Sequence, residues 1–323
     1  MLRIRDFIET REGLIFAVVS YFHPRDKYHA YLRYYPSLSG DRTKDGVKYA
    51  KISSTMESAG YLKDNYPLYI DSRGQHVPME RIRHDYCPEV RLREILSKPV
   101  DKLEQKVGEV SALFSTIPEE KRGVTGSILV NLHDSRSDID FVVYGTKNHL
   151  KARNILRELI DSGDVEELTD EQWRRIYLKR YSGEKTLSYA EFLWHERRKY
   201  HRGSMKGTIF DILLVRDVEE VFKEEKKNFQ DFGITTMKGR IIDASQAFDS
   251  PSVYKVRFED GSLGEIYSYT HTYAGQAFDG EDVEACGILK TTANNEPRLV
   301  VGTTREAEGE YIKVLTKRMG GVR

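Results

Sequence analysis

Two aspartates, Asp138 and Asp140, flank Ile139 at the start of an apolar run that is typical of a buried strand. Side chains alternate between the faces of a strand, so we expect both carboxylates on one face and Ile139, Phe141 and Val143 in a core. Carboxylates on one face repel each other unless a cation lies between them or water solvates them. Mg²⁺ uses one or two carboxylates plus phosphate oxygens, so this pair predicts a magnesium site beside a phosphate-bearing substrate.

A glycine turn at Gly126 and Ser127 lies eleven residues before this strand, counted from Ser127 to Asp138. Glycine lets the backbone approach a ligand without interference from a Cβ atom, and the serine adds a hydroxyl. Successive backbone amides in such a turn can bind an anion. The spacing therefore predicts a phosphate-binding turn next to the metal-binding strand.

A third acid, Asp211, interrupts the apolar strand 209–215. An unpaired carboxylate inside an apolar strand is costly, so we expect a specific role for it, as the third acid of a two-metal site. Two other readings of the acids remain open. They are a solvated strand end together with a buried Asp211 that a local hydrogen bond satisfies, or a degenerate enzyme.

The elements that must position these residues follow from the hydrophobic periodicity. A β-rich segment comes first, then helices and strands that alternate, then several short strands. The expected strands are 14–22, 29–35, 47–52, 123–127, 138–144, 208–215, 238–243, 253–258, 264–267, 283–289 and 298–302, and the expected helices are 54–65 with Ser54 as its cap, 100–114, 150–160 and 218–229.

The pattern predicts an α+β multidomain chain with three parts. They are a β-rich module at 1–92, an α/β core with a mixed sheet at 93–232 and a small β-barrel, OB-like, at 233–323. OB-folds often bind single-stranded nucleic acid, but residues 240–311 carry six basic and thirteen acidic residues. That balance disfavours phosphate contacts, so a protein-contact or structural role is an equal expectation.

Composition narrows the functional class. The 323 residues hold 51 basic and 51 acidic side chains, so no global positive field indicates nucleic-acid binding. Residues 171–206 are locally basic, with ten basic and four acidic residues, which suits a triphosphate, an RNA backbone or an ordinary solvated helical face. The two cysteines lie far apart in the sequence and do not have the close Cys and His spacing of a zinc site. A charged N-terminal segment and the absence of a long apolar run predict a cytoplasmic protein without membrane contact.

The segments Thr125-Gly-Ser127, Ser137-Asp-Ile-Asp140 and Phe210-Asp-Ile-Leu-Leu together resemble the signature of the DNA polymerase β-type nucleotidyltransferase superfamily. The likeness covers roughly residues 100–217. The whole chain also resembles the predicted nucleotidyltransferases of archaea. One departure concerns 128–132, which is apolar and lacks a glycine that many members carry, so we expect polar contacts from His133, Asp134 and Arg136 instead.

The resemblance implies a role for each site residue. Asp138 and Asp140 would bind two Mg²⁺ ions, and Asp211 would bind the catalytic ion and act as base. Residues of the nucleotide site would be Gly126, Ser127, Arg136 and Ser137.

The implied reaction moves a nucleoside monophosphate from an NTP to a hydroxyl, with pyrophosphate leaving. We expect an RNA 3′ end as acceptor, with RNA bound through residues 171–206. The alternatives are a protein or small-molecule acceptor, or a non-catalytic adaptor that binds nucleotide or RNA.

Overall fold

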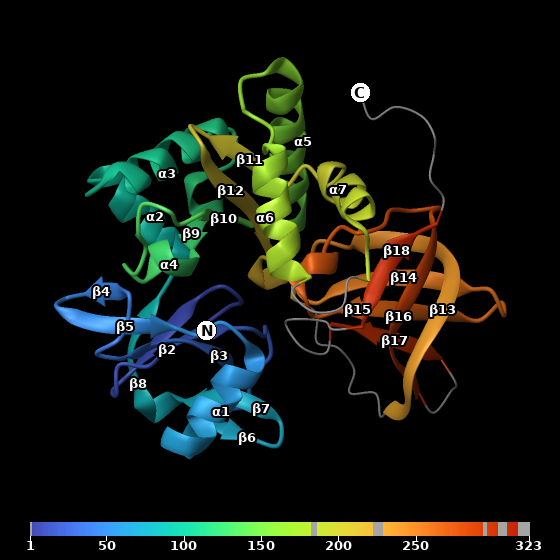
Figure 1. Ribbon diagram of the computed structural model, residues 1–323, viewed down its shortest axis with the longest axis horizontal. Coiled ribbons are helices and arrows are strands. Elements are labelled where there is room, and N and C mark those ends of the chain that lie inside the picture. Colours follow the sequence, from blue (N-terminus) through green and yellow to red (C-terminus); the bar gives the residue numbers. More distant parts are fainter. Residues whose placement is uncertain (1, 182–185, 222–228, 293–295, 303–308, 316–323) are drawn as a thin grey trace. The chain divides into compact units, whose positions relative to one another are not determined.

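The computed structural model describes residues 2–181, 186–221, 229–292, 296–302 and 309–315. The chain is an α+β protein with several sheets. It divides into two compact units (Figure 1). The first comprises Met1–Leu168 and Tyr200–Lys223, and the second comprises Thr169–Lys199 and Glu224–Arg323.

The first unit begins with an antiparallel sheet ordered β4-β5-β3-β2-β1-β8, to which β7 and β6 add through β3. Helix α1 lies against this sheet in Figure 1. Leu62 of α1 and Tyr69 of the 3-10 turn that follows it are buried in the core of the sheet. The predicted cap is confirmed, because the Ser54 hydroxyl accepts a hydrogen bond from the amide of Glu57 at 3.1 Å. The elements are β1 (Phe7–Thr10), β2 (Ile15–Val18), β3 (Lys27–Pro36), β4 (Arg42–Lys44), β5 (Val47–Lys51), α1 (Thr55–Asn65), η1 (Pro67–Tyr69), β6 (Ile70–Asp71), β7 (Gly74–Pro78), η2 (Met79–Arg81) and β8 (Ile82–Tyr86).

A second, mixed sheet of the same unit has the order β11-β12-β10-β9, in which only β10 and β12 run parallel. Asp101 starts α3 by accepting hydrogen bonds from the amides of Leu103 and Glu104, at 2.8 and 2.9 Å. The elements are α2 (Pro88–Ser97), α3 (Lys102–Leu113), η3 (Glu119–Lys121), β9 (Arg122–Thr125), α4 (Gly126–Leu129), β10 (Ile139–Tyr144), α5 (Thr146–Ser162), β11 (Arg202–Met205), β12 (Thr208–Val215) and η4 (Val218–Glu220).

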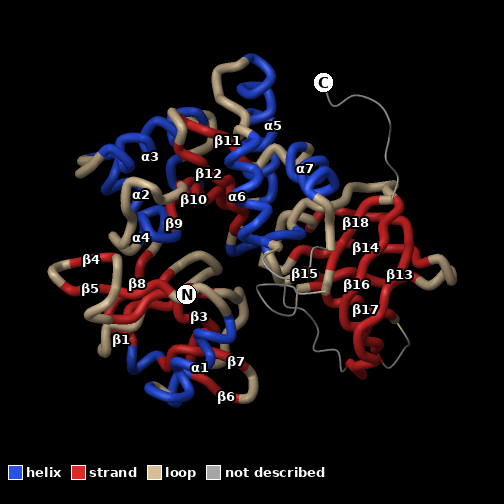
Figure 2. The backbone as a smooth tube through the Cα atoms, viewed as in Figure 1, coloured by secondary structure: helices blue, strands red, loops and turns tan. Residues whose placement is uncertain are grey.

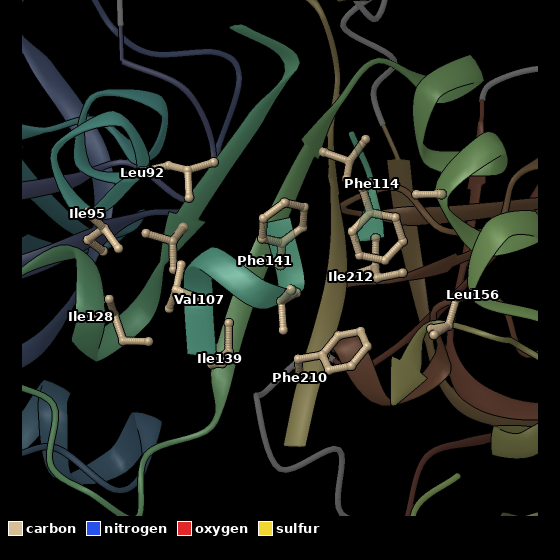
Figure 3. Packing of buried hydrophobic residues seen from close by; sticks show 14 of the residues in the cluster. Leu92, Ile95, Val107, Phe114, Ile128, Ile139, Phe141, Leu156, Phe210 and Ile212 are labelled. Atoms are coloured by element: carbon tan, nitrogen blue, oxygen red, sulfur yellow. The ribbon is translucent and has the colours of Figure 1, made fainter. Parts of the chain in front are cut away.

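The helices α2, α3 and α5 cover one face of this mixed sheet. Ile139, Phe141 and Val143 are buried in that core, as the alternation predicts, and Figure 3 shows Phe141 among Phe114 and other apolar side chains of the cluster. Because strand side chains alternate, Asp140 and Asp211 belong to the opposite face.

A smaller core joins the N-terminal sheet to the turn after β9. Tyr34 and Tyr49 of that sheet pack with Leu129, Val130 and Leu132, which directly follow Gly126 and Ser127 along the chain. The N-terminal sheet therefore borders the glycine turn.

The second unit consists mostly of strands, with two helices from residues 169–199 (Figure 2). Its sheet has the order β13-β14-β15-β17-β16-β18 and curls so that β13 pairs with β16 as well as with β14. Only β15 and β17 run parallel. The elements are α6 (Asp170–Arg180), α7 (Tyr189–Arg197), β13 (Phe229–Gln246), β14 (Ser252–Phe258), β15 (Leu263–Ser268), η5 (His271–Tyr273), β16 (Asp282–Thr292), β17 (Pro297–Val301) and β18 (Tyr311–Val314).

One predicted helix, 218–229, is wrong over the residues that the structure describes. Only a single 3-10 turn, Val218–Glu220, forms, and a strand begins at Phe229, while 222–228 lie outside the described residues. The Glu220 carboxylate accepts hydrogen bonds from the amide and hydroxyl of Thr146, at 3.0 and 2.6 Å. This contact fixes the turn against the start of α5. It joins residues that are distant in sequence, so the hydrophobic periodicity of 218–229 gives no sign of it.

The boundaries of the two compact units differ from those of the predicted domains. The predicted three-part division stays a prediction. The two compact units group residues 1–168 with 200–223, and residues 169–199 with the C-terminal strands. Within the described residues, no helix is both long and apolar enough to cross a membrane.

Candidate functional site

Strand register brings the acids of the mixed sheet together. Asp140 on β10 stands opposite Asp211 on the parallel strand β12 and opposite Thr125 on β9. Asp138 directly precedes β10, is exposed to solvent, and is close enough for its charge to act on Asp140. The neighbouring acids Asp138 and Asp140 and the distant Asp211 thus gather at one end of the sheet.

Asp140 lies in an environment that disfavours its charge. Its pKa is raised, first by burial and then by the negative charge of Asp211, with Asp138 adding to the effect. The positive charge of Arg5 opposes this shift without reversing it. The carboxylates therefore carry an excess of negative charge that a bound cation would relieve.

The glycine turn touches the same carboxylate. Gly126 has a φ of +70°, and a Cβ atom on it would lie 2.2 Å from Oδ2 of Asp140. Only glycine fits there, on both conformational and steric grounds. The half-buried Ser127 next to it uses its carbonyl to accept a hydrogen bond from the amide of Leu132 at 2.9 Å. Its hydroxyl has no hydrogen-bond partner within the described residues.

Asp211 is engaged by Arg202 of the neighbouring strand β11. The hairpin register places Arg202 opposite Asp211, and its Nε and Nη2 donate to the two carboxylate oxygens at 2.5 and 2.8 Å. This is a bidentate pair, which is strong and directional. Asp211 therefore has a local partner in the described structure, and a metal ion would have to share its carboxylate or displace the guanidinium.

The carboxylate oxygens of this site are chemically suited to bind Mg²⁺. Hard oxygen donors from one or two carboxylates, completed by phosphate oxygens, are the usual protein site for this ion. Asp138 and Asp140 would supply those donors. Across the described ranges, no three His, Cys, Asp or Glu side chains converge as a metal site. The structure therefore offers the acids for a shared protein–substrate site rather than a complete protein cage.

The segment after the turn is held by its own side chains. Arg136 is exposed and donates to Asp134 at 2.9 Å, and the hydroxyl of Ser137 accepts from the amide of Asp134 at 3.1 Å. His133 contacts the carboxylate of Asp101 at 2.8 Å. Arg42 of β4 adds a second ion pair to Asp134 at 3.0 Å. Arg136 and Ser137, expected at the nucleotide, thus have structural partners within this segment.

Two functional candidates, Arg5 and Arg202, were missed by sequence reasoning. The charge of Arg5 acts on both Asp140 and Asp211. No pattern in the sequence marks Arg5, since its place depends on contacts with distant strands. Arg202 had a usable signal, because the turn at Lys206 and Gly207, both with positive φ, sets the hairpin register opposite Asp211.

The basic stretch 171–206 does not form one open positive face. Glu196 forms ion pairs with both Lys199, at 2.5 Å, and Arg180, at 2.9 Å. The side chains of Glu196 and Lys199 are buried, and that of Arg180 is mostly buried. Lys185 lies outside the described residues. Among the described residues of this stretch, at least six basic side chains make ion pairs: Arg174, Arg180, Arg198, Lys199, Arg202 and Lys206.

Fold and site together define an α+β protein whose mixed sheet carries three carboxylates beside a glycine turn. The chain is 37% identical to the uncharacterized protein MJ1086 of Methanocaldococcus jannaschii over 337 aligned residues, which cover 97% of this chain and 99% of that protein. The chain therefore belongs to the family of that protein. No family model and no solved structure matches the chain.

Proposed function

We propose that this protein is a Mg²⁺-dependent nucleotidyltransferase that moves a nucleoside monophosphate from an NTP to a hydroxyl group and releases pyrophosphate. The observation that carries the proposal is the arrangement around Asp140. This carboxylate lies opposite Asp211 on a parallel strand, and Gly126 packs directly against it. A phosphate chain on the turn would therefore lie beside the carboxylates that hold its counter-ion.

Each residue of the site has a part in this proposal. Asp138 and Asp140 would hold Mg²⁺, with Asp211 as a further ligand of the catalytic ion. Gly126 and the Ser127 hydroxyl would contact the β- and γ-phosphates. The bound ions would neutralise charge on the α-phosphate and on the leaving pyrophosphate. Asp211 accepts the proton of the attacking hydroxyl, so Arg202 has to release at least one of its two carboxylate oxygens.

The finer fold assignment belongs to the same proposal. We take the mixed sheet as a nucleotidyltransferase core and the C-terminal sheet as an OB-like barrel. Support for the barrel comes from the pairing of β13 with both β14 and β16 and from the single parallel pair β15–β17. The acceptor that we expect first is an RNA 3′ end. Its contacts would have to come from outside the ion-paired residues of 171–206.

Incubation with each α-labelled NTP, Mg²⁺ and total cellular RNA tests the proposal. The label is then followed through nuclease and protease digestion. Label that nuclease releases identifies RNA as acceptor, and label that protease releases identifies a protein. If no NTP labels RNA, protein or a small molecule, the enzyme proposal fails.

One observation favours a second candidate, a non-catalytic adaptor that binds nucleotide or RNA. The bidentate Arg202 pair occupies Asp211, the residue that the enzyme proposal needs as a base. An adaptor would bind NTP without releasing pyrophosphate, and the pair would be purely structural. Pyrophosphate release measured alongside nucleotide binding separates the two candidates.

A further inference from the structure

Arg5 is held beside the candidate site by its backbone. Its φ of 79° lies in the left-handed region, which non-glycine residues adopt rarely. The amide of Arg5 donates to the carbonyl of Val18 at 3.2 Å, and its carbonyl accepts from the Thr125 hydroxyl at 2.6 Å. Thr125 stands opposite Asp140 and directly precedes Gly126. These contacts fix Arg5 next to both halves of the candidate site.

The guanidinium of Arg5 lacks a hydrogen-bond acceptor within the part of the chain that the structure describes. Its Nε is buried and has no hydrogen-bond partner among the described residues, and its side chain forms no ion pair within that part of the chain. Burial lowers the pKa of Arg5, whereas the charges of Asp140 and Asp211 act against that change. A buried donor without an acceptor is costly, which indicates that an acceptor absent from the protein itself completes the site.

A second arginine points to the charge of that acceptor. Arg33 lies at a β-bulge of β3, because the register passes from Tyr34 opposite Ile15 to Leu32 opposite Phe16. Bulges re-aim side chains, often next to functional sites. Arg33 is half-buried, forms no ion pair with a described residue, and its charge further disfavours the charge of Arg5. Two arginines that repel each other and lack ion-pair partners are the arrangement that an anion stabilises.

Lys51 adds a third positive charge at the same place. It stands opposite Tyr34 in the pairing of β3 and β5, and its charge acts on Asp140. Lys51 shares its strand face with Tyr49, which packs against the segment that follows Gly126. The cations thus come from the N-terminal sheet and the turn before its strand β1, while the acids and the glycine turn belong to the mixed sheet and the segments next to it.

We propose that Arg5, which lies just before β1, together with Arg33 and Lys51 of the N-terminal sheet, binds the triphosphate of the donor nucleotide. This inference rests on the proposed function and assigns part of its substrate binding to a sheet outside the predicted nucleotidyltransferase core. A triphosphate is favoured over a polymer backbone because Nε of the half-buried Arg5 is shielded from solvent and Arg5 contacts Thr125, which precedes Gly126. A compact chain end fits there more readily than a continuous strand. Mg²⁺ at the carboxylates would offset the remaining phosphate charge.

Calorimetric titration of the full-length protein with inorganic tripolyphosphate and Mg²⁺ tests this proposal without a choice of base. Arg33→Ala should raise the Kd roughly tenfold or more, as expected for the loss of a charge-assisted hydrogen bond. Arg33→Lys should fall between Arg33→Ala and wild type. Lys48→Ala is the matched control, because Lys48 lies on the opposite face of β5 from Lys51. It should change Kd by less than about twofold, as a solvated charge does.

Arg5→Lys is the second variant and should also weaken binding. If Arg5→Lys does not fold, Arg33→Ala decides the question alone. Wild-type affinity in Arg33→Ala, or no binding of tripolyphosphate by wild type, overturns the proposal. Labelled NTP transfer by that same Arg33→Ala protein at wild-type KM would show that the function stands and this inference fails. Tripolyphosphate binding that depends on Arg33, without any transfer, would show that the phosphate site stands and the enzyme proposal fails.

Discussion

Arg202 holds both carboxylate oxygens of Asp211, with its Nε at 2.5 Å and its Nη2 at 2.8 Å. Because Asp211 lies opposite Asp140 in the sheet, this pair sets how much of the acidic cluster is open to a cation. Arg202 thus competes with a cation for the carboxylate of Asp211. In the enzyme proposal, Arg202 has to release this carboxylate when metal and nucleotide bind.

Arg202→Gln should make Mg²⁺ more effective and the folded state weaker. Freeing Asp211 should lower the Mg²⁺ concentration for half-maximal transfer by roughly tenfold, which corresponds to one charge-assisted hydrogen bond. In metal-free buffer the free energy of unfolding should fall by about 1–3 kcal/mol, because Asp211 loses its partner. Arg298→Gln, which breaks the pair of Arg298 with Glu265 in the C-terminal sheet, is the control. It should lose stability with no change in the Mg²⁺ response, and an equal result for both variants would favour the adaptor candidate.

Gly126→Ala should destabilise the protein and weaken nucleotide binding. A Cβ atom would collide with Oδ2 of Asp140, in addition to the cost of a positive φ. Gly163→Ala is matched to it, since Gly163 has a φ of +83° and open space around its Cα. We expect a loss of about 1 kcal/mol for Gly163→Ala, and about 2–4 kcal/mol for Gly126→Ala, from chemical unfolding. Equal losses would mean that the Asp140 carboxylate moves away freely.

Asp140→Asn should raise stability in metal-free buffer while it abolishes transfer. The pKa of Asp140 is raised by burial and by Asp211, so its ionised form opposes folding at pH 8. Removing that charge should raise the free energy of unfolding, by roughly 0.5–2 kcal/mol as is common when functional strain is relieved. Thermal unfolding in EDTA measures this. A less stable Asp140→Asn protein would show that Arg5 already balances the carboxylate.

Asp6 should make stability depend on pH. It is almost fully buried, and burial raises its pKa to about 7, against the hydrogen bond from the Arg3 amide. Since this acid has a higher pKa in the folded state than in the unfolded state, its contribution to stability is present at low pH. That contribution is lost as pH rises from about 4 to about 7.

Urea unfolding at pH 5 and pH 8 measures the contribution of Asp6. Between these values wild type should lose up to about 2.5 kcal/mol more stability than Asp6→Asn, which keeps the shape of the side chain and an oxygen for the Arg3 amide. The same loss in both proteins would show that Asp6 ionises normally.

The parts of the site that depend on local pattern could be predicted from the sequence. Strand alternation correctly assigns Phe141 to the helical core, and so leaves Asp140 on the opposite face. Ser54 caps its helix through an amide only three residues away. These features need only neighbours along the chain.

Features that depend on distant residues could not be predicted in the same way. Arg5 lies at the site because its carbonyl meets Thr125, 120 residues later. The expected helix at 218–229 gives way to a short turn because Glu220 bonds Thr146. The bulge at Arg33 arises from the pairing of β3 with β2. None of these contacts leaves a periodic pattern in the sequence.

The most direct test of the central claim is Mg²⁺-dependent transfer from α-labelled NTPs by wild type, the double variant Asp138→Asn/Asp140→Asn and the exposed control Asp64→Asn on α1. The account predicts label on an acceptor with wild type and Asp64→Asn. It predicts a loss of at least about 100-fold for the double variant, as when a main electrostatic contribution to catalysis is removed. Transfer that survives in the double variant, or that wild type never shows with any NTP, would contradict it.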